Sequence, residues 1–535
     1  MTPKIRKPWH SEFNLSALLD RAGQLRNVPC VCDLTQKPQR GSLNWAIFLS
    51  FGDGVECMFR SPVAEEDGIS PQVAIEVLES EVATMNYIKE NSSIPVPEIF
   101  DYSSTKLNSI GIPYIIMSKA PGTQLQNLRW DPHPLEKGIF PQRQQLSKMQ
   151  KEKIMQQLGG IVSQLSNLRF NKLGSLFLEA GEYHVGKCLS PTFIFQGRDT
   201  LQDVKQGPFT HDDEYYQALI SVFLRNSQEL RLQHNVFFAP VPSLKDYETS
   251  QSRRSAISRW EDFVKIGGKI DSGQNRLDYC TAGHFLQQMV PHLCGETLGV
   301  LPKPANGFPF CHPDLSASNI FVDSELNITC VIDWAFTSTV PVSTALITPG
   351  LPHPRDGTGP FLDSAFKTSF IENGPYDEEK LAQTLWESTR RAWLFTRLAL
   401  LDGLQDYHYF KELYISVYKP TQEVNISALF KAAQKEDKFV QLAEELADDA
   451  EWAPEVLKDE DDYFAIIGNM EKPVGGEKEA KLIGVERHAI ARKINVVAGL
   501  SQDFVADHRL WRWIEETKRG CETVADNADA SKYNS

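Results

Sequence analysis

The sequence predicts an α+β protein of two lobes: a small antiparallel β lobe, then a large, mainly helical lobe with a helical C-terminal extension. Short apolar and aromatic runs separated by turn residues occur early in the chain, and helical apolar spacing dominates later. The length of 535 residues exceeds that of one compact domain. We expect an N-terminal extension over 1–34, the small lobe over 35–118, the large lobe over 119–420 and the C-terminal extension over 421–535.

The composition is that of a globular protein with an acidic surface. Hydrophobic residues make up 41% and charged residues 23% of the chain, which argues against a mainly disordered chain. The 55 basic and 70 acidic residues give a net charge of −15. Because binding to phosphate backbones needs clustered cations, we expect neither nucleic acid nor a membrane as partner. No apolar run reaches the ~18 residues that a membrane helix needs.

The cysteines and the first residues bear on location. Nine cysteines lie at scattered positions and form no disulfide framework. The first ten residues are basic but lack the apolar core of a signal peptide. We therefore expect a cytoplasmic protein.

The small lobe is predicted element by element. Strands are expected over 44–51 and 55–60, because Asp53-Gly54 between two apolar runs is a hairpin signal. A helix is expected over 71–90, where apolar residues fall on one helical face, and two prolines follow it. A buried strand over 114–117 completes the lobe.

The large lobe is predicted to be helical from Lys148 onward. Apolar residues between 154 and 168 have the spacing of one buried helix face. Further helices are expected near 214–225, 280–293 and 378–401, and over parts of 420–516. Acidic residues between 444 and 462 are interpreted as a solvated helix face rather than a site for cationic substrates, and Trp452, Trp511 and Trp513 as packing residues.

The most informative stretch lies between 308 and 334. His312, Asp314 and Asn319 form the pattern H-x-D-x-x-x-x-N directly before an apolar run at 320–322. A polar turn and a second apolar run at 328–332 follow, which predicts a tight hairpin. Such a hairpin returns Asp333 close to Asn319. The alternative is a polar loop beside a surface hairpin, with Asp and Asn present for turn chemistry.

Phosphoryl transfer from a nucleotide has a use for each of these side chains. A carboxylate must accept a hydrogen bond from the attacking hydroxyl, and oxygen ligands must hold Mg²⁺ across the phosphates. We assign Asp314 to the hydroxyl, and Asn319 and Asp333 to the metal. His312 is expected to support the loop. The cofactors expected are ATP and Mg²⁺.

These motifs resemble those of the aminoglycoside phosphotransferase family, within the protein-kinase-like fold, and most of all its large fungal-type members. His312-Pro-Asp314 with Asn319 is similar to the family's catalytic loop, and Asp333-Trp334 to its metal-binding segment. The resemblance implies a two-lobed kinase-like fold that transfers the γ-phosphate of ATP to a hydroxyl of a small molecule. Ile94-Pro-Val-Pro-Glu and Leu173-Gly-Ser-Leu also follow the family's pattern.

The resemblance also implies a nucleotide site in the small lobe. Ser42 and Asn44 belong to a segment similar to the loop over the phosphates, although it lacks the usual glycines and also fits a plain strand start. Arg60 takes the place of the phosphate-binding cation, and Glu81 that of its helical partner; an ordinary ion pair is the alternative. Met117 and Lys119 fall at the hinge that holds adenine through backbone groups, and the Met117 side chain is more typical of a core.

Arg60 departs from the family pattern, because kinases of this fold carry Lys there. Arg supplies a cation, but its planar fork is wider and bonds phosphate in pairs. A second hypothesis is therefore a pseudokinase-type module that binds nucleotide and recognises a protein partner. Protein kinase activity ranks last, since the segment after Asp333 lacks the D-F-G and A-P-E framework.

Overall fold

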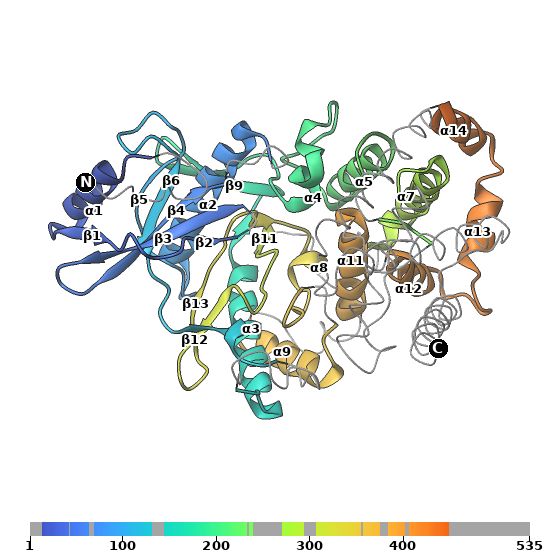
Figure 1. Ribbon diagram of the computed structural model, residues 1–535. Helices are drawn as coiled ribbons and strands as arrows, with labels where there is room; N and C mark the ends of the chain where they lie inside the picture. The colour runs from blue at the N-terminus through green and yellow to red at the C-terminus, as the bar shows by residue number, and fades with distance from the viewer. Residues whose placement is uncertain are drawn as a thin grey trace, which may run out of the picture. The chain divides into compact units, whose positions relative to one another are not determined.

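The predicted α+β class, with antiparallel sheets and many helices, is confirmed (Figure 1). The chain divides into two compact units. Unit 1 takes Met1–Pro132, Phe140–Val222 and Val290–Trp393, and unit 2 takes His133–Ile139, Phe223–Met289 and Leu394–Ser535. The computed structural model describes residues 13–41, 43–63, 69–130, 144–232, 235–238, 270–293, 307–354, 357–374, 384–401 and 406–448. The predicted boundaries at 34, 118 and 420 stay predictions.

An antiparallel six-stranded sheet forms the first part of unit 1. Its order is β1-β3-β4-β6-β5, with β2 paired to β3. The predicted turn at Asp53-Gly54 joins β3 to β4, and Gly54 has a φ of 81°, which suits glycine. The sheet begins upstream of residue 35. Its strands are β1 (Cys30–Cys32), β2 (Gln39–Arg40), β3 (Asn44–Phe51), β4 (Glu56–Pro62), β5 (Ile99–Ser103) and β6 (Tyr114–Ser118).

Two helices pack against this sheet, α1 (Leu15–Arg26) and α2 (Pro71–Asn91). Ile116 belongs to the apolar cluster that contains residues of α1, whereas its neighbour Ile115 belongs to the cluster that contains residues of α2. Because successive strand residues point to opposite faces, the two helices cover different faces of the sheet. The helix predicted over 71–90 is therefore confirmed and is buried against β6.

The remainder of unit 1 is built around α3 (Lys148–Asn167) and α9 (Pro360–Glu372). Ser147 and Gln150 form a capping box at the start of α3. A Cβ on Gly159 would lie 2.4 Å from the Phe366 carbonyl oxygen, so glycine permits the close approach of the two helices. The shorter helices of this part are η1 (Leu125–Asn127), α4 (Pro191–Ile194), η2 (Phe195–Thr200) and α8 (Val342–Ala345).

Two smaller antiparallel sheets complete unit 1. One has the order β10-β9-β14-β11-β8 and the other β13-β12-β7. The second sheet contains the predicted hairpin, β12 with β13. The strands are β7 (Thr123–Gln124), β8 (Arg169–Phe170), β9 (Gly174–Glu179), β10 (Glu182–Val185), β11 (Phe308–Cys311), β12 (Ile320–Val322), β13 (Ile328–Val331) and β14 (Ser338–Thr339).

Each of the other helices either belongs to unit 2 or has residues in both units. Leu277, Phe439 and Leu446 form one apolar cluster of unit 2. The predicted acidic stretch lies largely outside the described residues, as do the three tryptophans at 452, 511 and 513. No described helix combines the length and apolar content needed to cross a membrane. These helices are α5 (Asp212–Glu229), α7 (Gly273–Leu293), α11 (Thr384–Leu400), α12 (Asp406–Tyr418), α13 (Ile426–Ala433) and α14 (Asp437–Asp448).

Candidate functional site

The loop between β11 and β12 holds the first part of the candidate site. The Asn319 side chain donates from Nδ2 to the carbonyl oxygen of Asp314 and to its Oδ2, both at 3.0 Å. The amide therefore fixes one oxygen of the Asp314 carboxylate and leaves its own Oδ1 as an acceptor. The predicted partners Asp314 and Asn319 lie together, and Asn319 is buried.

His312 joins this loop to the strand that precedes Asp333. Its Nδ1 accepts the Asp314 backbone N–H at 3.1 Å, and its Nε2 lies 3.1 Å from the Ile332 carbonyl oxygen. Because a carbonyl only accepts, Nε2 carries the proton and the ring is neutral. Burial lowers the pKa of His312, although Asp314 and the Ile332 carbonyl act in the opposite direction. This geometry fits the supporting role predicted for His312.

The hairpin brings the second acid to the same place. Ile320 pairs with Val331, and the Ile332 N–H donates to the Asn319 carbonyl oxygen at 2.9 Å. Asp333 is the next residue, so it lies beside Asn319 as predicted. Its φ of 64° is in the left-handed region, which is unfavourable for a residue with a Cβ and is common at functional sites.

Side chains from outside the hairpin hold it in register. The Gln157 side chain on α3 accepts the Ile328 N–H at 2.7 Å and donates to the Leu326 carbonyl oxygen at 2.8 Å. The Thr329 hydroxyl donates to the Pro121 carbonyl oxygen at 2.6 Å. Gln157 and Thr329 could not be predicted as part of the site, because contacts across 171 and 208 positions leave no local signal in the sequence.

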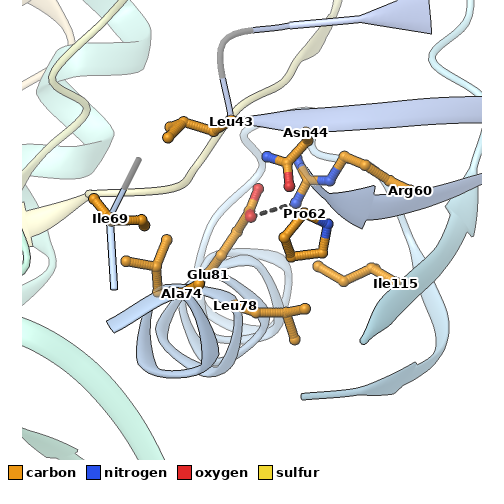
Figure 2. Close-up of a pocket in the computed structure, with 10 residues that line it drawn as sticks. Leu43, Asn44, Arg60, Pro62, Ile69, Ala74, Leu78, Glu81 and Ile115 are labelled. Atoms are coloured by element: carbon orange, nitrogen blue, oxygen red, sulfur yellow. Dashed lines mark hydrogen bonds and ion pairs between the residues drawn. The ribbon is translucent and has the colours of Figure 1, made fainter. Parts of the chain in front are cut away.

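Arg60 on β4 and Glu81 on α2 form the predicted ion pair (Figure 2). Their side chains are 13% and 3% exposed, so this pair is largely shielded from water. Burial acts to lower the pKa of Arg60, but Glu81 and Asp333 outweigh it and the pKa is raised. Burial raises the pKa of Glu81 against the effect of Arg60. Arg60 therefore stays charged within the field of both Glu81 and Asp333.

Asn44, Arg60 and Glu81 line one small pocket with a cavity volume of about 20 Å³ (Figure 2). The Gly41 N–H donates to the Asn44 carbonyl oxygen at 2.8 Å and closes the turn before β3. The structure thus brings together three of the residues predicted to bind nucleotide. The other side chains that line the pocket are Leu43, Pro62, Ile69, Ala74, Val77, Leu78 and Ile115.

Two more of the residues predicted to bind nucleotide, Met117 and Lys119, do not line this pocket. Met117 is buried in β6, opposite Met58, and its side chain belongs to the core. Lys119 is exposed and contacts Glu56 Oε2 at 2.5 Å. Neither side chain lines the pocket of Figure 2. A backbone contact to adenine at this position stays a prediction, and Ser42 lies outside the described residues.

The donors present fit a magnesium ion shared with phosphates. Among the described residues, Asp314 Oδ1 and Glu81 Oε1 are buried and accept no hydrogen bond. Burial raises the pKa of Asp333, and Asp314 adds to this while Arg60 opposes it. Within the same residues no three His, Cys, Asp or Glu side chains could hold a metal by themselves. The amide oxygen of Asn319 and the carboxylate of Asp333 are only two ligands, so they suit Mg²⁺ only if a nucleotide supplies further oxygens.

Sequence comparisons give distant fungal relatives. No family model matches the chain. A subtelomeric hrmA-associated cluster protein of Aspergillus fumigatus is 24% identical over 331 residues, which covers 58% of each chain. Altered inheritance of mitochondria protein 9 of Saccharomyces cerevisiae is 21% identical over 309 residues, 52% of this chain and 43% of that protein. The chain thus spans little more than half the length of the first of these relatives.

Solved structures similar to the chain include small-molecule kinases. A putative fructosamine-3-kinase from Thermobifida fusca has a TM-score of 0.38 and 12% identity, covering 76% of this chain and 98% of its own. Macrolide 2'-phosphotransferase MphH from Brachybacterium faecium has a TM-score of 0.34 and 14% identity, covering 76% and 100%. TM-scores this low carry no argument about function, so a function for this chain has to be inferred from the geometry of its own site.

Proposed function

We propose that the chain is an ATP-dependent phosphotransferase that transfers the γ-phosphate to a hydroxyl of a small molecule. One observation carries the proposal. Hydrogen bonds join Asn319 to Asp314 and to Ile332, the residue before Asp333, and Asp314 keeps a buried oxygen that accepts no hydrogen bond among the described residues. A carboxylate with one oxygen fixed and one free is suited to accept a proton from a bound hydroxyl.

In the proposed reaction, Asp314 Oδ1 accepts the hydrogen bond of the acceptor hydroxyl and aligns its oxygen with the γ-phosphorus. The hydroxyl oxygen forms a bond to phosphorus, the bond from phosphorus to the β,γ-bridging oxygen breaks, and ADP leaves. The hydroxyl proton passes to Asp314 and then to solvent. Asn319 holds Asp314 Oδ2 throughout, so the carboxylate needs no reorientation.

Asn319 Oδ1 and the Asp333 carboxylate are the groups that would hold Mg²⁺. A bound Mg²⁺ neutralises negative charge on the phosphates. Arg60 contributes a second positive charge, which Glu81 orients toward the pocket that Asn44 also lines. Arg60 bonds phosphate oxygens in this proposal, and Asn44 donates to them.

The test is turnover with a matched active-site variant. Purified full-length protein with Mg-ATP and a panel of amino alcohols and sugars should release ADP with at least one acceptor. Asp314→Asn, which has nearly the same shape, should lower kcat by about 100-fold or more, because a general base typically contributes 10²–10⁴-fold. Its nucleotide affinity should be unchanged. No turnover with any acceptor, or full turnover by Asp314→Asn, would contradict the proposal.

The pseudokinase alternative rests on Arg60. Its guanidinium is ion-paired and largely buried, so the small lobe supplies a cation other than the usual Lys. Arg60→Lys separates the two functions. If the natural site is catalytic, the substitution should change ATP turnover by less than about tenfold. A large gain in turnover would instead favour a module that binds nucleotide and recognises a protein partner.

We further propose that the protein acts in the cytoplasm. The seven cysteines that the structure describes are all free thiols, which suits a reducing compartment. Imaging of the tagged full chain, together with cell fractionation, checks this location. Recovery of the protein in the mitochondrial fraction would contradict it.

A further inference from the structure

The hairpin β9–β10 and the segment after it, residues 186–199, have no role in the proposed function. Together they form the segment 174–199. The hairpin starts at the Leu173-Gly-Ser-Leu motif. Gly174 has a φ of 154°, and a Cβ there would lie 2.1 Å from the Gly186 carbonyl oxygen. The Ser175 hydroxyl accepts the Leu189 N–H at 2.9 Å. The motif therefore lets β9 approach the chain that leaves β10, and it fixes the position of that chain.

This hairpin and segment contact α2 along its whole length. At the start of α2, Asp199 Oδ2 accepts the Ser70 N–H at 2.8 Å. In the middle, Lys187 Nζ lies 2.6 Å from Glu76 Oε2. At the end of the helix, the Tyr183 hydroxyl donates to Glu90 Oε2 at 3.2 Å.

Apolar contacts lie alongside these polar ones. Leu176 on β9 and Val185 on β10 belong to the same buried cluster as Val82 on α2. The ring of Tyr183 lies edge-on to that of Tyr87, with 5.0 Å between their centroids. The hairpin thus packs against one side of α2 within this shared cluster, and the hairpin and the segment after it together add an ion pair and two hydrogen bonds.

Glu81 lies on α2 between these contacts, five positions after Glu76. The strand side of the helix is also held, because the Ser104 hydroxyl donates to Glu79 Oε1 at 2.6 Å. A helix held at both ends and on two sides has little freedom to rotate or slide. The position of Glu81 opposite Arg60 is then fixed by protein contacts and needs no bound ligand.

We propose that the segment 174–199 is a clamp that locks α2 with Glu81 paired to Arg60, so that the cation site is preformed and requires no activating modification. Lys187 and Asp199 are its positioning residues. The inference rests on the proposed function only in calling that cation site a nucleotide site. The clamp acts on Arg60 through Glu81 and touches no substrate.

Charge reversal tests the clamp. Lys187→Glu or Glu76→Lys alone places like charges together, and the double variant restores an ion pair of opposite sense. We expect each single variant to speed hydrogen exchange of the α2 amides about three- to fivefold in the nucleotide-free protein, as is typical for loss of a partly exposed pair. Affinity for a Mg-bound non-hydrolysable ATP analogue should weaken by a similar factor. The double variant should recover both.

Lys367→Met is the matched control. Lys367 Nζ lies 2.6 Å from Asp363 Oδ2 within α9, the same separation as in the Lys187–Glu76 pair, and 4.9 Å from the centroid of the Trp386 ring. This variant should leave α2 exchange and analogue affinity unchanged. Lys187→Arg should also behave as the natural protein, because it keeps the charge.

Two results would overturn the clamp: unchanged α2 exchange in both single variants, or equal acceleration in the Lys367→Met control. Faster α2 exchange with unchanged analogue affinity would show that the contacts are structural only, which also overturns it. The exchange readout needs no nucleotide. Failure of the natural protein to bind the analogue would therefore overturn the proposed function, while rescue of exchange by the double variant would still support the clamp.

Discussion

Glu81 in unit 1 and Asp278 in unit 2 are both buried carboxyl groups, 3% and 8% exposed, but their surroundings differ. Glu81 is ion-paired with Arg60 and keeps one oxygen that accepts no hydrogen bond among the described residues. Asp278 Oδ1 accepts hydrogen bonds from the neutral amides of Gln274 and Gln434, each at 2.9 Å. Burial raises the pKa of Asp278 to about 7, against the effect of those two amides.

This difference is the one we expect between Glu81, the acid of the proposed nucleotide site, and Asp278, an acid with a structural role. Both pKa values are perturbed, so perturbation alone would mark both as candidates for a site. Glu81, however, lines a pocket together with a cation, whereas Asp278 links α7 to the residue that follows α13. Under the proposed function, Glu81 uses its charge to orient Arg60, whereas the amides around Asp278 leave that acid without a charged partner among the contacts named here.

The largest expected effect on the free energy of unfolding comes from breaking the ion pair between Arg60 and Glu81. Arg60→Met leaves Glu81 buried without its cation, and we expect a loss of about 3–5 kcal/mol in the free energy of unfolding, as for other buried pairs that lose one partner. Urea unfolding of the full chain at pH 7 measures this. The double variant Arg60→Met with Glu81→Leu should regain most of the loss, because it leaves no buried charge. A cost below about 1 kcal/mol for the single variant would mean that the pair is effectively solvated.

A smaller change in the free energy of unfolding, of opposite sign, is expected when Asp278 is replaced by Asn and the pH is raised. Its pKa is about 7 in the folded protein and 3.8 as the ordinary value, so the folded state holds the extra proton between those values. Stability from this group is therefore full below about pH 4 and is lost as the pH rises to about 7. Asp278→Asn keeps the acceptor oxygen, and its stability relative to the natural protein should increase by roughly 3 kcal/mol from pH 5 to pH 8. An equal difference at both pH values would contradict a neutral Asp278.

The smallest effect concerns the pH dependence of metal binding. Burial raises the pKa of Asp333, and the metal needs the ionised carboxylate. As the pH falls, the Mg²⁺-dependent part of nucleotide affinity should decline. The decline should begin at pH values higher than those at which an ordinary Asp becomes protonated. Calorimetric titrations at several pH values, each with and without Mg²⁺, measure this. A decline confined to pH values near 3.8 would show that Asp333 titrates as an exposed acid.

Local signals explain what could be predicted from the sequence. The turn at Asp53-Gly54 and the polar turn 323–327 each join strands that are neighbours in the chain, so the hairpins and the meeting of Asn319 with Asp333 follow from short-range patterns. The contacts of α2 with the segment 174–199 could not be predicted in this way. Asp199 is 129 positions from Ser70, and nothing in the chain between them indicates that they meet.

The structure of unit 2 shows the same limit. The sequence predicts helices near 214–225 and 280–293, and both are confirmed and extend further, as α5 and α7. Gln434 lies 156 positions from Asp278, so their hydrogen bond is visible only in the folded chain. Spacing indicates which helix face is buried but not which polar group a buried acid will meet.

The most direct test of the account is magnesium-dependent nucleotide binding by the natural protein and by Asp333→Asn. Calorimetric titration with a non-hydrolysable ATP analogue should show that Mg²⁺ tightens binding to the natural protein by tenfold or more, and that Asp333→Asn loses this gain while keeping the weaker metal-free binding. Equal tightening by Mg²⁺ in both proteins would remove Asp333 from the metal site and contradict the account.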